Sequence, residues 1–281
     1  MDQLEITDAI ENAARAIKES EAIIILAGAG MGVDSGLPDF RGKDGFWKAY
    51  PMFKSRGSGF YDLASSRNFE NNPVLAWGFY GHRLNLYRET VPHDGFRLLK
   101  QWAGNKPGGY FIFTSNVDGQ FQKAGFDEDR IVECHGSIHH LQTFSGAKSE
   151  IMSSDGFHVD VDLDTMKAKN LPRHPETNEL LRPNILMFDD WFWVEDRCRQ
   201  QKIKYQAWLK GLKSNYQEVV LIELGAGSAI PTVKQQSLIL RERYNATLIK
   251  INPEGCHLAD IVLKMGALEG LTKINDLIEA G

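Results

Sequence analysis

The sequence predicts an α/β fold, a doubly wound, Rossmann-like parallel sheet with a small inserted module. Short runs rich in β-branched and apolar residues alternate along the chain with segments of helical periodicity. Such runs are typical of parallel strands that are buried on both faces. Several of them end in glycine-rich or polar turns, first at Gly28 and later at Gly225, at the edge where such folds bind ligands.

The periodicity places the individual elements. Ile6, Ile10, Ala13 and Ile17 recur at helical spacing, which predicts an amphipathic helix at the start of the chain. The expected helices cover residues 6–19, 73–88, 93–102, 196–212, 231–243 and 267–278. The expected strands cover residues 22–27, 109–114, 131–134, 182–188, 218–224, 246–251 and 261–264.

Two stretches lack a clean period. Residues 43–72 mix glycine, serine, aromatic and charged residues, which indicates a mobile loop with short helices that closes over a ligand. Residues 145–180 are polar and indicate a small inserted module. After this module, we expect residues 182–188 to return the chain to the main sheet.

Composition narrows the classes of function. The chain has 281 residues and a net charge of −5, and 42% of its residues are hydrophobic. Because nucleic-acid binding needs a basic face, this charge argues against nucleic acid as the main partner and leaves room for a basic peptide. The chain has no apolar run long enough for a membrane span, and residues 1–5 are acidic rather than signal-like. We therefore expect a cytoplasmic protein that does not bind membranes.

The most informative segment is the turn after the first expected strand. Residues 28–42 read GAGMGVDSGLPDFRG. A strand that feeds a glycine-rich turn brings backbone N–H groups against a pyrophosphate. The usual dinucleotide fingerprint has a third glycine where this chain has Val33. The end of the segment places an acid, Asp39, an aromatic ring, Phe40, and a guanidinium, Arg41, beside the turn.

This segment resembles the first motif of the sirtuin family, GAG-x(4)-SG-[IL]-PDFRG, and matches it throughout. Residues 114–118, TSNVD, resemble the family's TQNID, and His135-Gly136 resembles its catalytic HG. Residues 224–228, LGAGS, resemble the family's GTS loop, and Ile251-Asn252 resembles its adenosine-side IN. The resemblance runs from about residue 7 to residue 275 and is thin between residues 140 and 180.

The resemblance implies an enzyme that cleaves nicotinamide from NAD and passes an acyl group from lysine to ADP-ribose. It makes His135 the general base, Asn116 the residue that positions the ribose and a water, and Asp118 the residue that contacts the carboxamide. The implied cofactor-binding residues are Gly28, Ala29, Gly30, Asp39, Phe40, Arg41, Ser115, Asn116, Asp118, His135, Gly225, Ala226, Gly227 and Asn252.

The same resemblance implies a single catalytic domain that spans residues 1–281. The larger, NAD-binding part of this domain is expected to comprise residues 6–42, 73–138 and 182–281, and the smaller part residues 43–72 and 139–181.

The chain departs from the family pattern where the family binds zinc. The usual sirtuin holds a structural zinc on two Cys-x-x-Cys pairs, which supply four thiolates. This chain has only three widely spaced cysteines, Cys134, Cys198 and Cys256. A mixed site that includes His139 and His140 follows no zinc-ligand spacing, and we expect both histidines on a helix or turn surface. The sequence therefore predicts no metal site and no disulfide framework.

The chain departs from the family pattern at two further places, one near the nicotinamide ribose and one on the acceptor side. Ser115 stands where the family has glutamine, which shortens a side chain near the nicotinamide ribose. Phe188-Asp189-Asp190 stands where the family has Phe-Gly-Glu, on the strand that pairs with the acyl-lysine peptide. Asp189 puts a charged side chain where glycine lets two backbones meet.

Three functions stay open at this point. The first is an NAD-dependent protein lysine deacylase, which acts on an acyl-lysine protein or peptide. The alternative keeps NAD cleavage and changes the acceptor: water gives an NAD glycohydrolase, and a protein side chain gives an ADP-ribosyltransferase. The third is a non-catalytic sensor of NAD or ADP-ribose, which would need neither His135 nor Asn116.

Overall fold

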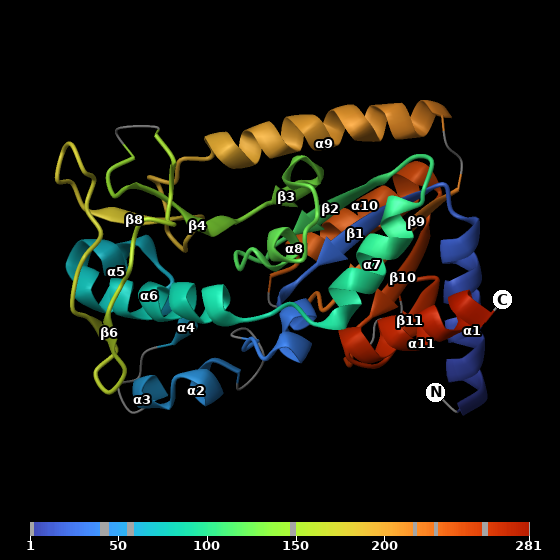
Figure 1. Cartoon of the computed structure of the whole chain (residues 1–281), viewed down its shortest axis with the longest axis horizontal. Helices are drawn as coiled ribbons and strands as arrows, with labels where there is room; N and C mark the ends of the chain where they lie inside the picture. Colours follow the sequence, from blue (N-terminus) through green and yellow to red (C-terminus); the bar gives the residue numbers. More distant parts are fainter. Residues whose placement is uncertain are drawn as a thin grey trace.

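The computed structural model describes residues 3–39, 45–54, 59–146, 150–215, 218–227, 230–254 and 258–280. Its centre is a six-stranded, all-parallel sheet with the strand order β11-β10-β9-β1-β2-β3 (Figure 1). The strands are β1 (Ala22–Ala27), β2 (Tyr110–Thr114), β3 (Ile131–Glu133), β9 (Val219–Leu224), β10 (Thr247–Ile251) and β11 (Ile261–Leu263). The predicted doubly wound α/β fold is therefore confirmed.

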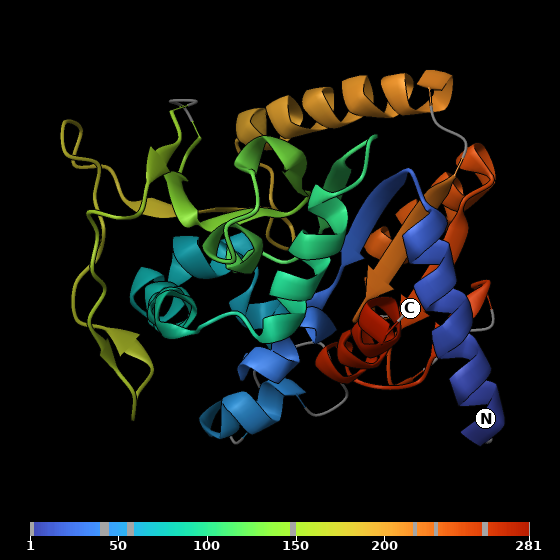
Figure 2. The ribbon, with the colours of Figure 1, turned by 45° about the vertical axis from the view of Figure 1, so that its right-hand side comes forward.

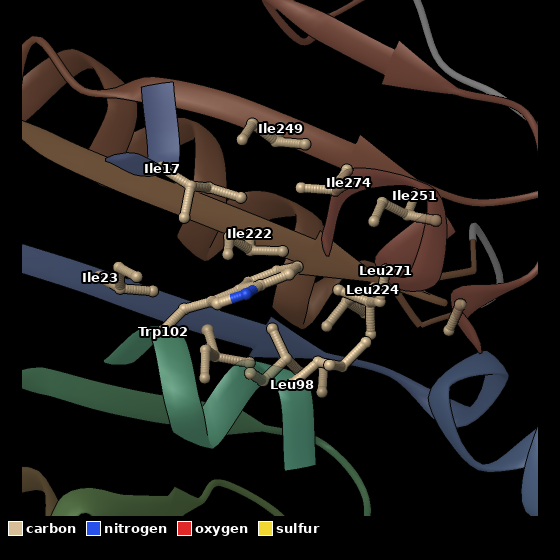
Figure 3. Packing of buried hydrophobic residues seen from close by; sticks show 14 of the residues in the cluster. Ile17, Ile23, Leu98, Trp102, Ile222, Leu224, Ile249, Ile251, Leu271 and Ile274 are labelled. Carbon is tan, nitrogen blue, oxygen red and sulfur yellow. The ribbon is translucent and has the colours of Figure 1, made fainter. Parts of the chain in front are cut away.

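Helices cover both faces of this sheet. One face carries α1 (Gln3–Glu19), α7 (Asp94–Gly104) and α11 (Ala267–Ala280), and the other carries α9 (Asp196–Asn215) and α10 (Thr232–Tyr244). Figure 3 shows how the first layer packs: Trp102 of α7 and Leu271 of α11 meet the isoleucines of β1, β9 and β10. The apolar residues of α1 recur at helical spacing, which puts them on one face of the helix. Ile17 and the apolar residues one and two turns before it pack in this core.

A second, smaller unit lies beside the main sheet (Figure 2). It is built on a three-stranded antiparallel sheet of β5 (Met152–Ser153), β4 (Gly136–Thr143) and β8 (Leu181–Ile185), with a short hairpin of β6 (Val161–Asp162) and β7 (Lys167–Ala168). Its helices are α2 (Gly45–Ala49), α3 (Pro51–Lys54), α4 (Phe60–Leu63), α5 (Ser66–Asn71) and α6 (Pro73–Glu89). These elements share an aromatic core around Trp77, Phe79 and Tyr80 of α6.

The expectation that residues 182–188 rejoin the main sheet is wrong. β8 pairs antiparallel with β4, with Gly136 opposite Ile185, so among the described strands it belongs to the small sheet and not to the parallel one. The helix that begins at Pro73, expected in the larger part, packs in the second core. The strand was misplaced because a buried apolar run shows that a segment is buried but not against which sheet.

Buried polar side chains fasten the end of β8 to the segment that follows it. Arg182 and Asp190 form an ion pair in which both side chains are fully buried. The Asp190 carboxylate also accepts hydrogen bonds from the backbone N–H groups of Met187 and Phe192, each at 3.2 Å. Gln142 of β4 accepts from the Val194 N–H at 3.0 Å. Residues 186–194 are thus held against the small sheet by side chains rather than by a regular strand.

Asp190→Ala should therefore lower the free energy of unfolding by about 3–5 kcal/mol, because it leaves the Arg182 guanidinium buried without its charged partner. Chemical denaturation checks this value. The matched control is Glu269→Ala, which breaks the exposed Lys273–Glu269 pair and should cost less than about 1 kcal/mol. Equal losses in the two variants would contradict the structural role given to Asp190.

Candidate active site

Two adjoining cavities lie at the carboxyl ends of the parallel strands, where this fold binds ligands. The larger has a volume of about 480 Å³ and the smaller about 330 Å³. Ala29, Ser115 and Ile230 line both, so the two cavities meet along these residues. A ligand that spans them would run from β9 and β10 past the first glycine turn to β2 and β3.

The larger cavity is bordered by two glycine turns that touch each other. The Gly30 N–H donates to the Gly225 carbonyl at 3.0 Å. A Cβ at Gly30 would lie 2.7 Å from the Gly225 Cα, and one at Gly28 would lie 2.7 Å from the Gly225 oxygen. Gly225 also has a φ of +57°, which favours glycine. These positions form a cradle of bare backbone of the kind that accommodates a pyrophosphate.

Most residues predicted to bind NAD line the larger cavity. They are Gly28, Ala29, Gly30, Asp39, Ser115, Gly225, Ala226, Gly227 and Asn252. Asn252 is fixed there because its Nδ2 donates to the Ala226 carbonyl at 3.0 Å and its Oδ1 accepts from the Glu254 N–H at 2.9 Å. The predicted residues Phe40 and Arg41 lie outside the described residues.

The smaller cavity brings the three predicted catalytic residues together. Asn116, Asp118 and His135 all line it, although His135 comes 19 positions after Asn116 in the sequence. Asn116 sits just beyond β2, and its Nδ2 donates to the Gly28 carbonyl at 2.9 Å, which ties it to the first glycine turn. His135 lies in the turn between β3 and β4, where its carbonyl accepts from the Leu186 N–H at 2.9 Å.

The carboxyl group of Asp118 has an unusual environment. Burial raises its pKa from 3.8 to about 6, and the nearby Glu133 carboxylate adds to the rise. The hydrogen bond from the Gln120 N–H, at 2.9 Å, and the charge of Arg83 act in the opposite direction. A strongly shifted carboxyl group in a cavity is characteristic of functional sites.

Arg83 also lines the smaller cavity, and the sequence reasoning did not single it out. It lines the smaller cavity from α6, is nearly buried, and donates from Nε and Nη2 to the Tyr87 hydroxyl at 3.0 and 2.8 Å. A sequence signal was present, because an arginine stands between Tyr80 and Tyr87 on an otherwise aromatic helix face. Charged side chains are seldom fully buried unless they are paired.

The segment expected to pair with a peptide is paired within the chain. Phe188 donates its N–H to the Ala64 carbonyl and accepts from the Ser66 N–H, both at 3.0 Å. Asp189 has a φ of +52°, and its Oδ2 accepts from the Tyr61 hydroxyl at 2.9 Å. The position where the family has glycine therefore has a left-handed backbone in this chain, and its carboxylate is hydrogen-bonded to Tyr61 of α4.

The expectation for the two histidines after the HG motif is wrong. His139 and His140 lie in β4 and are partly buried, because β4 continues directly from the turn that carries His135. Burial lowers the pKa of both imidazoles, that of His140 to about 4. Within the ranges that the structure describes, no group of three or more His, Cys, Asp or Glu side chains is arranged to hold a metal ion.

Comparison with known proteins identifies the family. The Sir2 family model matches residues 28–204, which is more than half of the chain. A protein from Aeropyrum pernix named NAD-dependent protein deacylase is 30% identical over 269 residues, which cover 93% of this chain and 94% of that protein. The chain belongs to the Sir2 family. The resemblance inferred from the motifs is thereby confirmed.

Further Sir2 relatives agree with this assignment. An NAD-dependent protein deacylase from Aquifex aeolicus is 27% identical over 263 residues, covering 92% of this Sir2 chain and 96% of the relative. Among solved structures, a Sir2 homologue in complex with NAD has a TM-score of 0.71 at 23% identity, with 96% of this chain and 94% of that chain covered. The likeness to this solved structure establishes the fold. In the described residues no helix is long and apolar enough to cross a membrane.

Proposed function

We propose that this chain is an NAD-dependent protein lysine deacylase that transfers an acyl group from lysine to ADP-ribose. The observation that carries the proposal is the convergence of Asn116, Asp118 and His135 in a cavity that adjoins the glycine cradle. The names of the two relatives, both NAD-dependent protein deacylases, support the same activity. The proposal includes a cytoplasmic enzyme, with an acyl-lysine protein or peptide as its partner.

NAD, when bound, supplies the ribose carbon that the acyl oxygen attacks and the hydroxyls that receive the acyl group. In this proposal the backbone of Gly28–Gly30 and of Gly225–Gly227 holds the diphosphate, and Asn252 faces the adenosine side. Asp118 accepts a hydrogen bond from the carboxamide, and Asn116 orients the ribose. His135 takes a proton from a ribose hydroxyl, because histidine is the side chain that most often serves as a general base.

The proposal also includes a fold that needs no structural zinc. The sequence has no Cys-x-x-Cys pair that could supply four thiolates. The buried pair of Arg182 and Asp190, together with the Gln142 amide, fastens the segment between residues 186 and 194 without a metal.

A second candidate function has one specific observation in its favour. Both backbone hydrogen-bonding groups of Phe188 are used by Ala64 and Ser66, so strand addition of a peptide at this residue would have to displace them. An NAD glycohydrolase would not need to pair a peptide with Phe188, and an ADP-ribosyltransferase would use a different acceptor. The acceptor, rather than NAD cleavage, separates this candidate from the first.

Release of nicotinamide from NAD by purified, chelator-treated protein should depend on an added acyl-lysine peptide, because the acyl oxygen is the nucleophile.

His135→Ala should reduce the rate of deacylation about 10²- to 10⁴-fold, which is the usual contribution of a general base. Chromatographic measurement of nicotinamide and of the acylated ADP-ribose checks both results. Release of nicotinamide without peptide would favour the glycohydrolase, and full deacylation by His135→Ala would remove His135 from its role.

The wall of the smaller cavity bears on the choice of acyl group. The Arg83 guanidinium lies 5.2 to 5.5 Å from the ring centres of Phe79, Tyr80 and Tyr87. These rings and the Tyr87 hydroxyl keep the cation in place on an otherwise aromatic surface. A guanidinium in such a setting attracts a carboxylate. We therefore propose a preference for acyl chains that end in a carboxylate over the neutral acetyl group.

Arg83→Met should lower kcat/KM for a succinyl-lysine peptide about 10- to 100-fold, since a hydrogen bond to a charged group is lost. The same substitution should leave kcat/KM for the acetyl-lysine peptide within a few-fold of its original value. Steady-state kinetics with the two peptides, matched in sequence, makes the comparison. An equal loss on both peptides would contradict the role of Arg83 in acyl selection.

A further inference from the structure

A third cavity lies behind the catalytic one. Its volume is about 380 Å³, and it is lined by residues of α6, α8 (Gln120–Lys123), β4 and α9. Tyr87 and Asp118 line both this rear cavity and the smaller front cavity, so they form part of the wall between the two. His139 lines the rear cavity alone and does not face the proposed NAD site.

From the rear, His139 holds the backbone of Asp118. Its Nε2 lies 2.9 Å from the Asp118 carbonyl oxygen. Because a carbonyl only accepts, Nε2 carries the hydrogen and donates it. Burial lowers the pKa of this imidazole, which favours the neutral ring that this hydrogen bond needs on Nε2 only.

The contact requires a glycine next to Asp118. Gly119 has a φ of +70° and a ψ of 14°, which is the left-handed region. A Cβ at Gly119 would lie 2.6 Å from the His139 Cδ2 and 2.8 Å from its Nε2. The imidazole therefore packs directly on the bare Cα, and Asp118, Gly119 and His139 form one matched set.

Backbone hydrogen bonds of β4 hold His139 in place. The His139 carbonyl accepts from the Ser154 N–H at 2.9 Å, and the neighbouring Ile138 N–H donates to the Val117 carbonyl at 3.0 Å. β4 thus makes two bonds to the loop that carries Asp118, one from its backbone and one from His139. Because His135 immediately precedes β4, the same strand sets the position of Asp118 relative to His135.

We propose that His139 is a positioning residue for NAD binding, which holds the peptide between Asp118 and Gly119 so that the Asp118 carboxyl group faces the front cavity. Without the bond from Nε2, this peptide can rotate and carry the carboxyl group away from the carboxamide. The inference rests on the proposed function, because it assigns the Asp118 carboxyl group to NAD. It adds a residue that touches neither NAD nor the acyl substrate.

The test compares His139→Leu, which removes the donor, with His139→Gln, which keeps an amide N–H at a similar reach. His140→Leu is the control, since His140 also lines the rear cavity and, in the described part of the chain, no side-chain bond joins it to residues 116–119. The measurements are the Kd of NAD by calorimetry, kcat and the KM for NAD with a saturating acyl-lysine peptide, and Tm.

His139→Leu should raise the Kd and the KM for NAD about five- to tenfold, the worth of one positioning hydrogen bond, with a smaller change in kcat. His139→Gln should recover most of this affinity, and His140→Leu should bind NAD like the unaltered protein. An unchanged Kd for NAD in His139→Leu overturns this inference and leaves the proposed function standing. Equal losses of affinity and Tm in the Leu and Gln variants also overturn it, because they indicate a purely structural role. Failure of the unaltered protein to bind NAD overturns the proposed function, and this inference with it.

Discussion

The contact between the two glycine turns is the constraint on which the rest of the site depends. A side chain at Gly28, Gly30 or Gly225 would collide with the backbone of the opposite turn at under 3 Å. Since β1 pairs with β9 in register up to Ala27 and Leu224, both turns leave the sheet at the same level and meet there. Bare backbone at that level is what lets a diphosphate approach the strand ends.

The second unit completes the site from the other side. β4 begins one residue after His135, so the proposed base stands where the chain leaves the parallel sheet for the antiparallel one. Residues 64–66 and 186–190 then close the front cavity through mutual backbone hydrogen bonds and the buried pair of Arg182 and Asp190. Buried polar groups supply most of the contacts that hold these two segments together. They favour a single arrangement because a buried polar group without its partner is energetically costly.

Local pattern predicted a large share of this structure. The first strand occurs at Ala22–Ala27 as expected, and a helix begins at Pro73 because proline suits the first turn. Long-range pairing was not predictable: nothing local shows that β8 joins β4, or that His139 reaches a carbonyl 21 residues away. Asn116, Asp118 and His135 were found through motifs, whereas Arg83 belongs to no motif and became apparent only from its place in the cavity.

A crystal structure of this chain with ADP-ribose tests the central claim most directly. The account predicts the diphosphate on the backbone of Gly28–Gly30, the adenosine beside Asn252, and the distal ribose between Asn116 and His135. The glycine contact should be unchanged, because the cradle is already formed. Absence of the ligand from these cavities at saturating concentration, or a diphosphate bound elsewhere, would contradict the account.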